Sequence, residues 1–226
     1  MSIYIPIFRS LNQAKIRYVV VGGLATVLHG YGRLTADIDL MIDLDQEEAK
    51  KTIKLFTELG LAPRVPVDPL DFADAEKRKH WIEVKSMQVF SLWNPEDALI
   101  SVDLFVNHPI EFEGLWSRAE AVDIGGEIIN IASIPDLIEL KRISNRPQDL
   151  EGIRQWRLIL NLTSERRMSA KSTGIEKEDW HYSWEDHQEM QLRGWLQSSH
   201  QQRLAWLEEA IKLAHKSGAL PKNQTP

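Results

Sequence analysis

The sequence contains no cysteine, and this absence excludes several kinds of chemistry at once. A chain without cysteine cannot form disulfide bonds, bind zinc through thiolates or attack a substrate with a thiol. It also has no apolar run near the ~18 residues that a membrane-spanning helix needs. Its opening stretch, MSIYIPIFRSLNQAK, has none of the basic, apolar and small-residue segments of a secretory signal. We therefore expect a cytoplasmic protein that does not bind membranes.

Positive charge is also scarce. The chain has 27 Lys and Arg residues against 33 Asp and Glu residues, which gives a net charge of −6. This balance argues against a surface coated in positive charge for sequence-independent binding of nucleic acid, although a local basic patch is compatible with it. The sequence has no G-x-x-x-x-G-K-[ST] loop, no G-x-S-x-G elbow and no H-E-x-x-H pair. P-loop nucleotide hydrolases, serine hydrolases of the elbow type and zinc peptidases of that motif are thereby disfavoured.

Short strands and helices follow one another along the chain, and 43% of its residues are hydrophobic, enough for a sizeable core. Alternating or β-branched stretches predict strands, whereas capping residues and 3.6-residue spacing predict helices. We expect strands at 17–23, 35–43, 81–92 and 99–106, a hairpin around 125–126 leading into 128–132, helices at 24–29, 45–60, 133–143 and 147–162, and an irregular connection at 62–80.

The fold class we predict is α+β, a mixed sheet flanked by helices with a small helical appendage at the C-terminal end. Residues 1–162 would form the main domain, and the polar stretch 163–180 would form a linker. Residues 181–226 would form the helical tail. In this tail Leu204, Leu207, Ile211 and Ala214 share one helical face, and Gly218 stands where a helix would end.

Two aspartates on one predicted strand carry the main chemical signal. Residues two apart in a strand point the same way, so Asp37 and Asp39 would present both carboxylates on one face. Such a pair repels itself unless a cation compensates, and Mg²⁺ is commonly held by carboxylates together with substrate phosphates. The pair Gly22–Gly23, between a strand and a helix, would let phosphate oxygens approach the backbone. The alternative is that the two aspartates are structural or merely solvated.

A third aspartate stands in a comparable setting. In the stretch LISVDLFV, Ile100, Val102 and Leu104 would share one face and leave Asp103 on the other. An aspartate within an apolar strand is costly unless it is paired or bound to a cation. Asp103 therefore joins the candidate site, with an ion pair to arginine or a solvated sheet edge as the alternatives.

These stretches resemble the nucleotidyltransferase superfamily. Residues 18–42, YVVVGGLATVLHGYGRLTADIDLMI, are similar to its signature of an apolar residue, Gly-Gly or Gly-Ser, a gap, and Asp-apolar-Asp-apolar. SVDLF at 101–105 resembles the strand that carries the third carboxylate of that superfamily. The R-x-T-x-D-I-D pattern and residues 135–153, PDLIELKRISNRPQDLEGI, are similar to nucleotidyltransferase-like proteins of bacterial toxin–antitoxin and abortive-infection systems. The resemblance covers roughly residues 15–160, and Gly23 departs from it, since serine is common there.

The resemblance implies a nucleotidyltransferase-like sheet and metal-dependent transfer of a nucleoside monophosphate from a nucleoside triphosphate, ATP, CTP or another. Asp37, Asp39 and Asp103 would bind Mg²⁺ and act in catalysis. The nucleotide would be bound by Gly22, Gly23, Arg33, Thr35 and Lys141. Arg33 could equally pair with a neighbouring carboxylate, and Lys141 could be an ordinary solvated lysine.

Three functions fit this reading of the sequence. The first is transfer to a macromolecular acceptor, RNA or a protein hydroxyl, in a toxin–antitoxin setting with an antitoxin or regulatory partner. The second is a catalytically weak or inactive member of the fold that acts as a binding or regulatory, antitoxin-like protein. The third is a small-molecule nucleotidyltransferase of the aminoglycoside-modifying type. The tail resembles small helical proteins that accompany such enzymes, which would make it a fused regulatory module.

Overall fold

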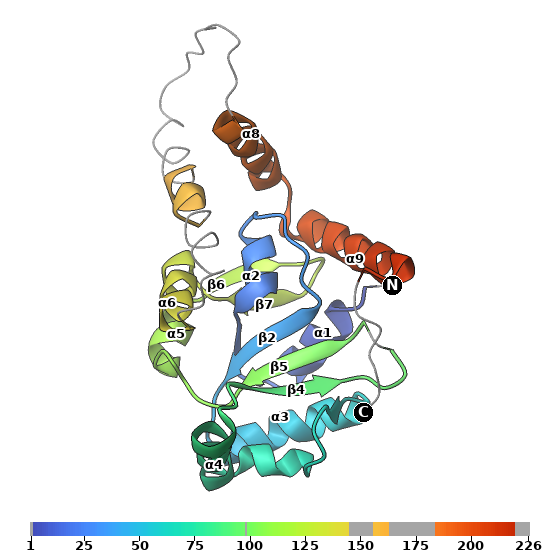
Figure 1. Ribbon diagram of the computed structural model, residues 1–226, viewed down its shortest axis with the longest axis vertical. Coiled ribbons are helices and arrows are strands. Elements are labelled where there is room, and N and C mark those ends of the chain that lie inside the picture. The colour runs from blue at the N-terminus through green and yellow to red at the C-terminus, as the bar shows by residue number, and fades with distance from the viewer. Residues whose placement is uncertain (1, 98, 145–155, 163–183, 220–226) are drawn as a thin grey trace, which may run out of the picture.

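The computed structural model describes residues 2–97, 99–144, 156–162 and 184–219. Within these residues, seven strands form one mixed sheet in the order β3-β4-β5-β2-β1-β7-β6. Helices pack around this sheet (Figure 1), so the predicted α+β class is confirmed. The strands are β1 (Tyr18–Val20), β2 (Asp37–Ile42), β3 (Ala62–Pro63), β4 (Val89–Trp93), β5 (Ser101–Phe105), β6 (Glu120–Asp123) and β7 (Ile128–Ile131).

The helices include one near the N-terminal end and one after β5 that the sequence patterns did not predict, α1 and α5. Residues 156–162 are also helical, whereas the first part of the helix predicted at 147–162 lies outside the described residues. The helices are α1 (Ile5–Gln13), α2 (Gly22–Leu28), α3 (Gln46–Glu58), the 3₁₀ helix η1 (Pro69–Ala73), α4 (Ala75–Lys85), α5 (Phe112–Arg118), α6 (Ile134–Ser144), α8 (Trp184–Gln197) and α9 (His200–Ser217).

The strand predicted at 81–92 is wrong in its first half, because residues 81–85 belong to α4. The side chain of Asp74 accepts hydrogen bonds from the first backbone N–H groups of α4 and so starts the helix within the supposedly irregular connection. Ser86, with φ of 51°, ends it in the left-handed region. The ring of Trp81 then stacks on that of Phe90 in β4, with centroids 5.3 Å apart and planes 2° from parallel. The aromatic residue that suggested a strand is instead a helix-to-sheet contact.

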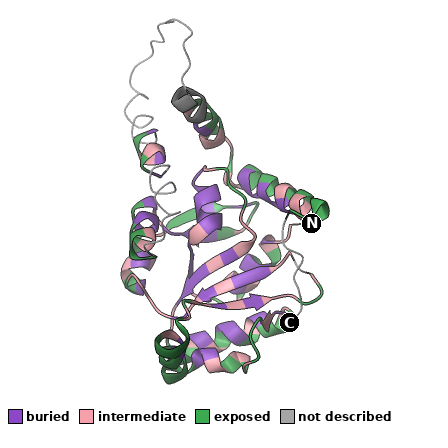
Figure 2. Cartoon of the chain, in the orientation of Figure 1, coloured by how far each residue is buried: buried purple, intermediate pink, exposed green. Residues whose placement is uncertain are grey.

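The alternation predicted for the central strands is present. Ile38 and Leu40 of β2, like Val102 and Leu104 of β5, are fully buried and belong to one hydrophobic core. The residues between them are only partly buried, which Figure 2 shows as alternating bands along β2, β5 and β4. The sheet therefore has an apolar face that holds the fold together and a second face that carries polar side chains.

The last helix belongs to the same core as the sheet. Leu204, Leu207 and Ile211 of α9 are buried in it, and α9 packs against α2. The buried guanidinium of Arg203 donates a hydrogen bond to the carbonyl oxygen of Leu28, at the end of α2. The buried carboxylate of Glu208 accepts a hydrogen bond from the backbone N–H of Ile3 at 3.1 Å. Thus α9 contacts both α2 and the N-terminal residues; the proposed linker at 163–180 lies outside the described residues.

None of the helices in the described part of the chain is long and apolar enough to cross a membrane.

Candidate active site

The pairing of β2 with β5 sets the three aspartates side by side. The two strands are parallel, and Asp39 is paired with Asp103 while Asp37 is paired with Ser101. Paired residues on adjacent strands have their side chains on the same face of the sheet. Since Asp37 and Asp39 are two residues apart, all three carboxylates lie on the polar face. The structure thus places the three residues singled out in the sequence on one face of two neighbouring strands.

Gly22 lies directly against one of these carboxylates. The strand β1 ends at Val20, and Gly22 adopts φ of +60° as the chain turns into α2. A Cβ atom on Gly22 would lie 2.1 Å from Oδ2 of Asp39, which is far closer than two non-bonded atoms can approach. The backbone N–H of Gly23 donates a hydrogen bond to the same oxygen at 3.3 Å. The position therefore requires glycine for its backbone conformation and for the space that Asp39 occupies.

Gly23 has a different neighbour, the side chain of Thr35. A Cβ atom on Gly23 would lie 2.2 Å from Oγ1 of Thr35 and 2.6 Å from its Cβ. Rotation of the threonine side chain cannot relieve the second contact, because Cβ does not move in such a rotation. The Thr35 hydroxyl therefore occupies the space that a serine at position 23 would need.

The site concentrates negative charge. Burial raises the pKa of Asp39 to about 7, the charge of Asp103 adds to this, and the hydrogen bond from Gly23 opposes it. Burial also raises the pKa of Asp103, and the charge of Asp37 contributes in the same direction. Arg33 lowers the pKa of Asp39, and Arg64 lowers that of Asp103, but neither reverses the direction of the shift. Carboxylates crowded in this way favour a proton or a cation between them.

This crowding predicts a pH-dependent gain in stability for Asp39→Asn. Between about pH 4 and 7 the folded chain retains a proton on Asp39 that the unfolded chain has released, so stability falls as pH rises through this range. At pH 8 we expect the free energy of unfolding of the variant to be roughly 1–2 kcal/mol higher than that of the original chain, or its Tm about 2–8 °C higher, after allowance for solvent screening. At pH 4 the two proteins should have the same stability. Thermal unfolding in EDTA measures this, and equal Tm values at pH 8 would contradict it.

Residues 7–201 match the protein family described as "Nucleotidyltransferase of unknown function (DUF6036)". The chain belongs to this nucleotidyltransferase family. It is also similar to the crystal structure of a candidate nucleotidyltransferase from Thermotoga maritima, with 19% identity, a TM-score of 0.45, and coverage of 68% of this chain and 89% of the other. No curated protein matches the sequence at a significant level.

The donor set suits a hard divalent cation, because three carboxylates share one face and two of them are paired neighbours. However, no group of three His, Asp or Glu side chains in the described residues is arranged closely enough to hold a metal ion. Asp39 points its Oδ2 at Gly23. A cation held by all three aspartates would therefore require their side chains to lie closer together than they do here.

Two of the other residues singled out in the sequence are placed as follows. Arg33 is exposed in the loop before β2, close enough to Asp39 to lower its pKa. Lys141 lies on α6 with its Nζ 4.9 Å from the centre of the Trp156 ring. A role for Lys141 on the triphosphate stays a prediction, and Arg146 and Asp149, which suggested it, lie outside the described residues.

Three residues near the carboxylates of β2 and β5 were missed in the sequence. Ser91 of β4 is paired with Asp103 and hydrogen bonds to it, while Trp93 is paired with Ser101. Arg64, just after β3, donates a hydrogen bond from Nη2 to Oγ of Ser101 at 3.3 Å. The alternation of β4 could have placed Ser91 and Trp93 on the polar face, but no local signal identifies Arg64.

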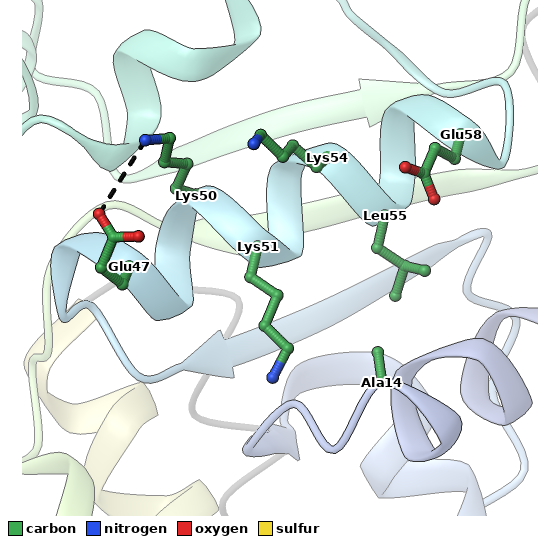
Figure 3. A pocket seen from close by; sticks show the side chains of 7 residues that line it. All are labelled: Ala14, Glu47, Lys50, Lys51, Lys54, Leu55 and Glu58. Atoms are coloured by element: carbon green, nitrogen blue, oxygen red, sulfur yellow. Dashed lines mark ion pairs between the residues drawn. The ribbon is translucent and has the colours of Figure 1, made fainter.

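A separate hollow of about 360 Å³ lies along α3 (Figure 3). Lys50, Lys51 and Lys54 line it together with Glu47, and Oε1 of Glu47 lies 4.0 Å from Nζ of Lys50. Its lining residues come from α3 and from Ala14, so it does not include the carboxylates of β2 and β5.

Proposed function

We propose that this protein is a divalent-cation-dependent nucleotidyltransferase that transfers a nucleoside monophosphate from a nucleoside triphosphate to a macromolecular acceptor. The observation that carries the proposal is the parallel pairing of Asp39 with Asp103 beside Gly22, where a Cβ atom would meet the Asp39 carboxylate at 2.1 Å. Backbone without side chains next to paired carboxylates is the arrangement that a triphosphate with its cation needs.

Asp37, Asp39 and Asp103 would hold Mg²⁺, which when bound supplies positive charge to the transferring phosphate and to the oxygens on both sides of it. Asp103, whose pKa is raised by burial, would accept the proton of the acceptor hydroxyl. The hydroxyl oxygen then forms a bond to the α-phosphorus as the bond to the β-phosphate oxygen breaks, and pyrophosphate leaves. Catalysis of this kind depends mainly on positioning and on stabilisation of charge.

The chain would bind the triphosphate on the side of α2. Gly22 and Gly23 add no side chains at the start of α2, and the Thr35 hydroxyl lies close to where a serine at position 23 would carry its own hydroxyl. Arg33 and Lys141 would contact the phosphates as cations. We place the protein in a toxin–antitoxin setting in the cytoplasm, with an antitoxin or regulatory partner, on the resemblance of its motifs.

A second candidate function is a binding or regulatory protein without catalysis. It is favoured by the hydrogen bond of Gly23 N–H to Asp39, because this contact occupies the donor that a phosphate would need. On this view the fold is retained for recognition of a partner alone. A small-molecule acceptor of the aminoglycoside type is the third candidate.

Removal of the divalent cation tests the proposal. The full chain is incubated with each of four α-³²P-labelled nucleoside triphosphates and with cellular RNA or protein, in Mg²⁺ or in EDTA. We expect label to enter one acceptor in Mg²⁺ and at least a hundredfold less in EDTA, because the carboxylates alone cannot neutralise the phosphates.

Absence of label from every acceptor with every nucleotide would overturn the proposal. Calorimetry with Mg-ATP then separates the candidates, because a non-catalytic binding protein would ignore the nucleotide. Label in a purified aminoglycoside but in no macromolecule would favour the small-molecule function.

A further inference from the structure

An arginine and a tryptophan lie beside the carboxylates, on the side away from the glycine pair. Across the sheet, the strand order β4-β5-β2-β1 puts Gly22 and Gly23, which follow β1, on one side of the aspartates. Trp93 lies on the other side, since β4 pairs with the far edge of β5. Both Trp93 and Asp103 are partly buried residues of the polar face.

Several contacts fix Arg64 above this part of the sheet. Its backbone N–H donates a hydrogen bond to the carbonyl oxygen of Ser91 at 3.0 Å, which continues the pairing of β3 with β4. Its guanidinium donates to Oγ of Ser101, the residue paired with Asp37, at 3.3 Å. The centre of the guanidinium lies 5.7 Å from the centre of the Trp93 ring. Arg64 therefore lies next to both the carboxylates and an aromatic surface.

In-line phosphoryl transfer requires the attacking oxygen and the leaving pyrophosphate to be on opposite sides of the phosphorus atom. If the triphosphate lies against Gly22 and Gly23, the acceptor must approach from the side of β4. This step rests on the function proposed above. The groups that an acceptor meets there are Arg64 and Trp93.

We propose that Arg64 and Trp93 bind the terminal nucleotide of a single-stranded RNA, whose hydroxyl is the acceptor in the reaction. The planes of the indole and the guanidinium give a nucleobase a stacking surface. The fork of N–H groups on Arg64 matches the oxygens of a phosphate. The RNA hydroxyl lies near Asp103, which takes its proton as pyrophosphate leaves from the other side.

The neighbouring sheet edge favours RNA over a protein segment. A peptide commonly binds an enzyme by adding a strand to a sheet edge. Here the edge strand β3 has two residues, one of which is Pro63 and cannot donate a hydrogen bond. Pro66 and Pro69 follow closely. The net charge of −6 also limits the contact to a short end of the RNA rather than a long duplex.

Anisotropy of a 5′-fluorescein-labelled ten-nucleotide single-stranded RNA tests the proposal without nucleoside triphosphate. We expect Arg64→Ala and Trp93→Ala each to raise the Kd of the full-length protein by about 5–100-fold, the range for loss of a stacked base or a phosphate contact. Trp93→Phe should keep most of the affinity, because it retains an aromatic plane. The matched control is Arg9→Ala, which removes an exposed arginine of α1 that pairs with Glu127 at 2.6 Å; its Kd should not change.

Calorimetry on the same proteins measures the Kd of a non-hydrolysable ATP analogue in the presence of Mg²⁺. This Kd should be equal in all variants. Unchanged RNA affinity in both alanine variants would overturn the proposal. So would weaker nucleotide binding with unchanged RNA binding, since that would assign Arg64 to the triphosphate. Transfer of label to protein and never to RNA would overturn it as well, while leaving the nucleotidyltransferase activity intact. RNA binding that depends on Arg64 and Trp93 without any transfer would support the RNA site and count against the proposed activity.

Discussion

Asp39→Asn is expected to lower nucleotidyl transfer at least about a thousandfold, because a neutral amide cannot hold the cation that the transferring phosphate needs. Asn has nearly the shape of Asp and can still accept the hydrogen bond from Gly23 N–H. The fold should therefore persist, and the loss should appear in kcat and in kcat/KM together, as for a group that acts in the transition state. Initial rates at saturating Mg²⁺ and nucleotide, with circular dichroism as a check on folding, measure it.

Asp43→Asn is the matched control for this loss. Asp43 follows β2 directly, but its carboxylate pairs with Arg17 and caps the turn at Asp45 rather than facing Asp103. We expect its transfer rate to stay within about twofold of the original, with a small loss of stability from the partly exposed ion pair. The assignment of Asp39 fails if Asp39→Asn keeps more than a tenth of the activity, or if both variants lose it equally.

Gly23→Ser is expected to damage the site although many relatives of the fold carry serine there. Its Cβ would overlap Oγ1 and Cβ of Thr35 at 2.2 and 2.6 Å, so the loop before β2 must shift. Overpacking of this kind costs about 1–3 kcal/mol. We expect Tm to fall by several degrees and Mg-ATP affinity to fall about tenfold or more, because the shifted loop leads directly into Asp37 at the start of β2. The added change Thr35→Gly removes both overlapping atoms and should restore most of the nucleotide affinity.

Gly194→Ser is the matched control, because it makes the same change from glycine to serine at a position with open space around it. Gly194 lies in α8 with no atom within 4 Å of a Cβ placed on it, and serine is the better helix former. Its Tm and nucleotide affinity should be unchanged or slightly higher. A Gly23→Ser protein that matches it in both measurements would show that Thr35 does not fill the space of a serine.

The centre of the fold was predictable because its signals are local. Alternation of apolar and polar residues is enough to place Asp37 and Asp39 on one face of β2, and the same argument places Asp103 on the polar face of β5. The strand predicted at 17–23 is shorter than expected, since Gly22 takes a positive φ and already begins α2. The paired glycines were identified from the sequence, but only the fold reveals that Gly22 faces Asp39 and Gly23 faces Thr35.

What the sequence could not supply depends on contacts between distant segments. Residues 81–85 have the β-branched and aromatic composition of a strand, yet the cap at Asp74 and the stacking of Trp81 on Phe90 make them helical. Arg64 comes from a proline-rich connection, and its place beside Ser101 follows from the pairing of β3 with β4. Likewise, the apolar face of α9 was evident, but nothing local indicated that Arg203 would cap α2 at Leu28.

The contact between positions 23 and 35 also constrains how this family can diverge. With the spacing of 2.2 Å between a Cβ at position 23 and the Thr35 hydroxyl, one side chain can occupy the space but not two. A lineage that acquires serine at 23 should therefore carry glycine at 35 or a displaced loop, and a lineage with glycine at 23 can keep threonine. The two positions should be inherited as a correlated pair, although eleven residues of chain lie between them.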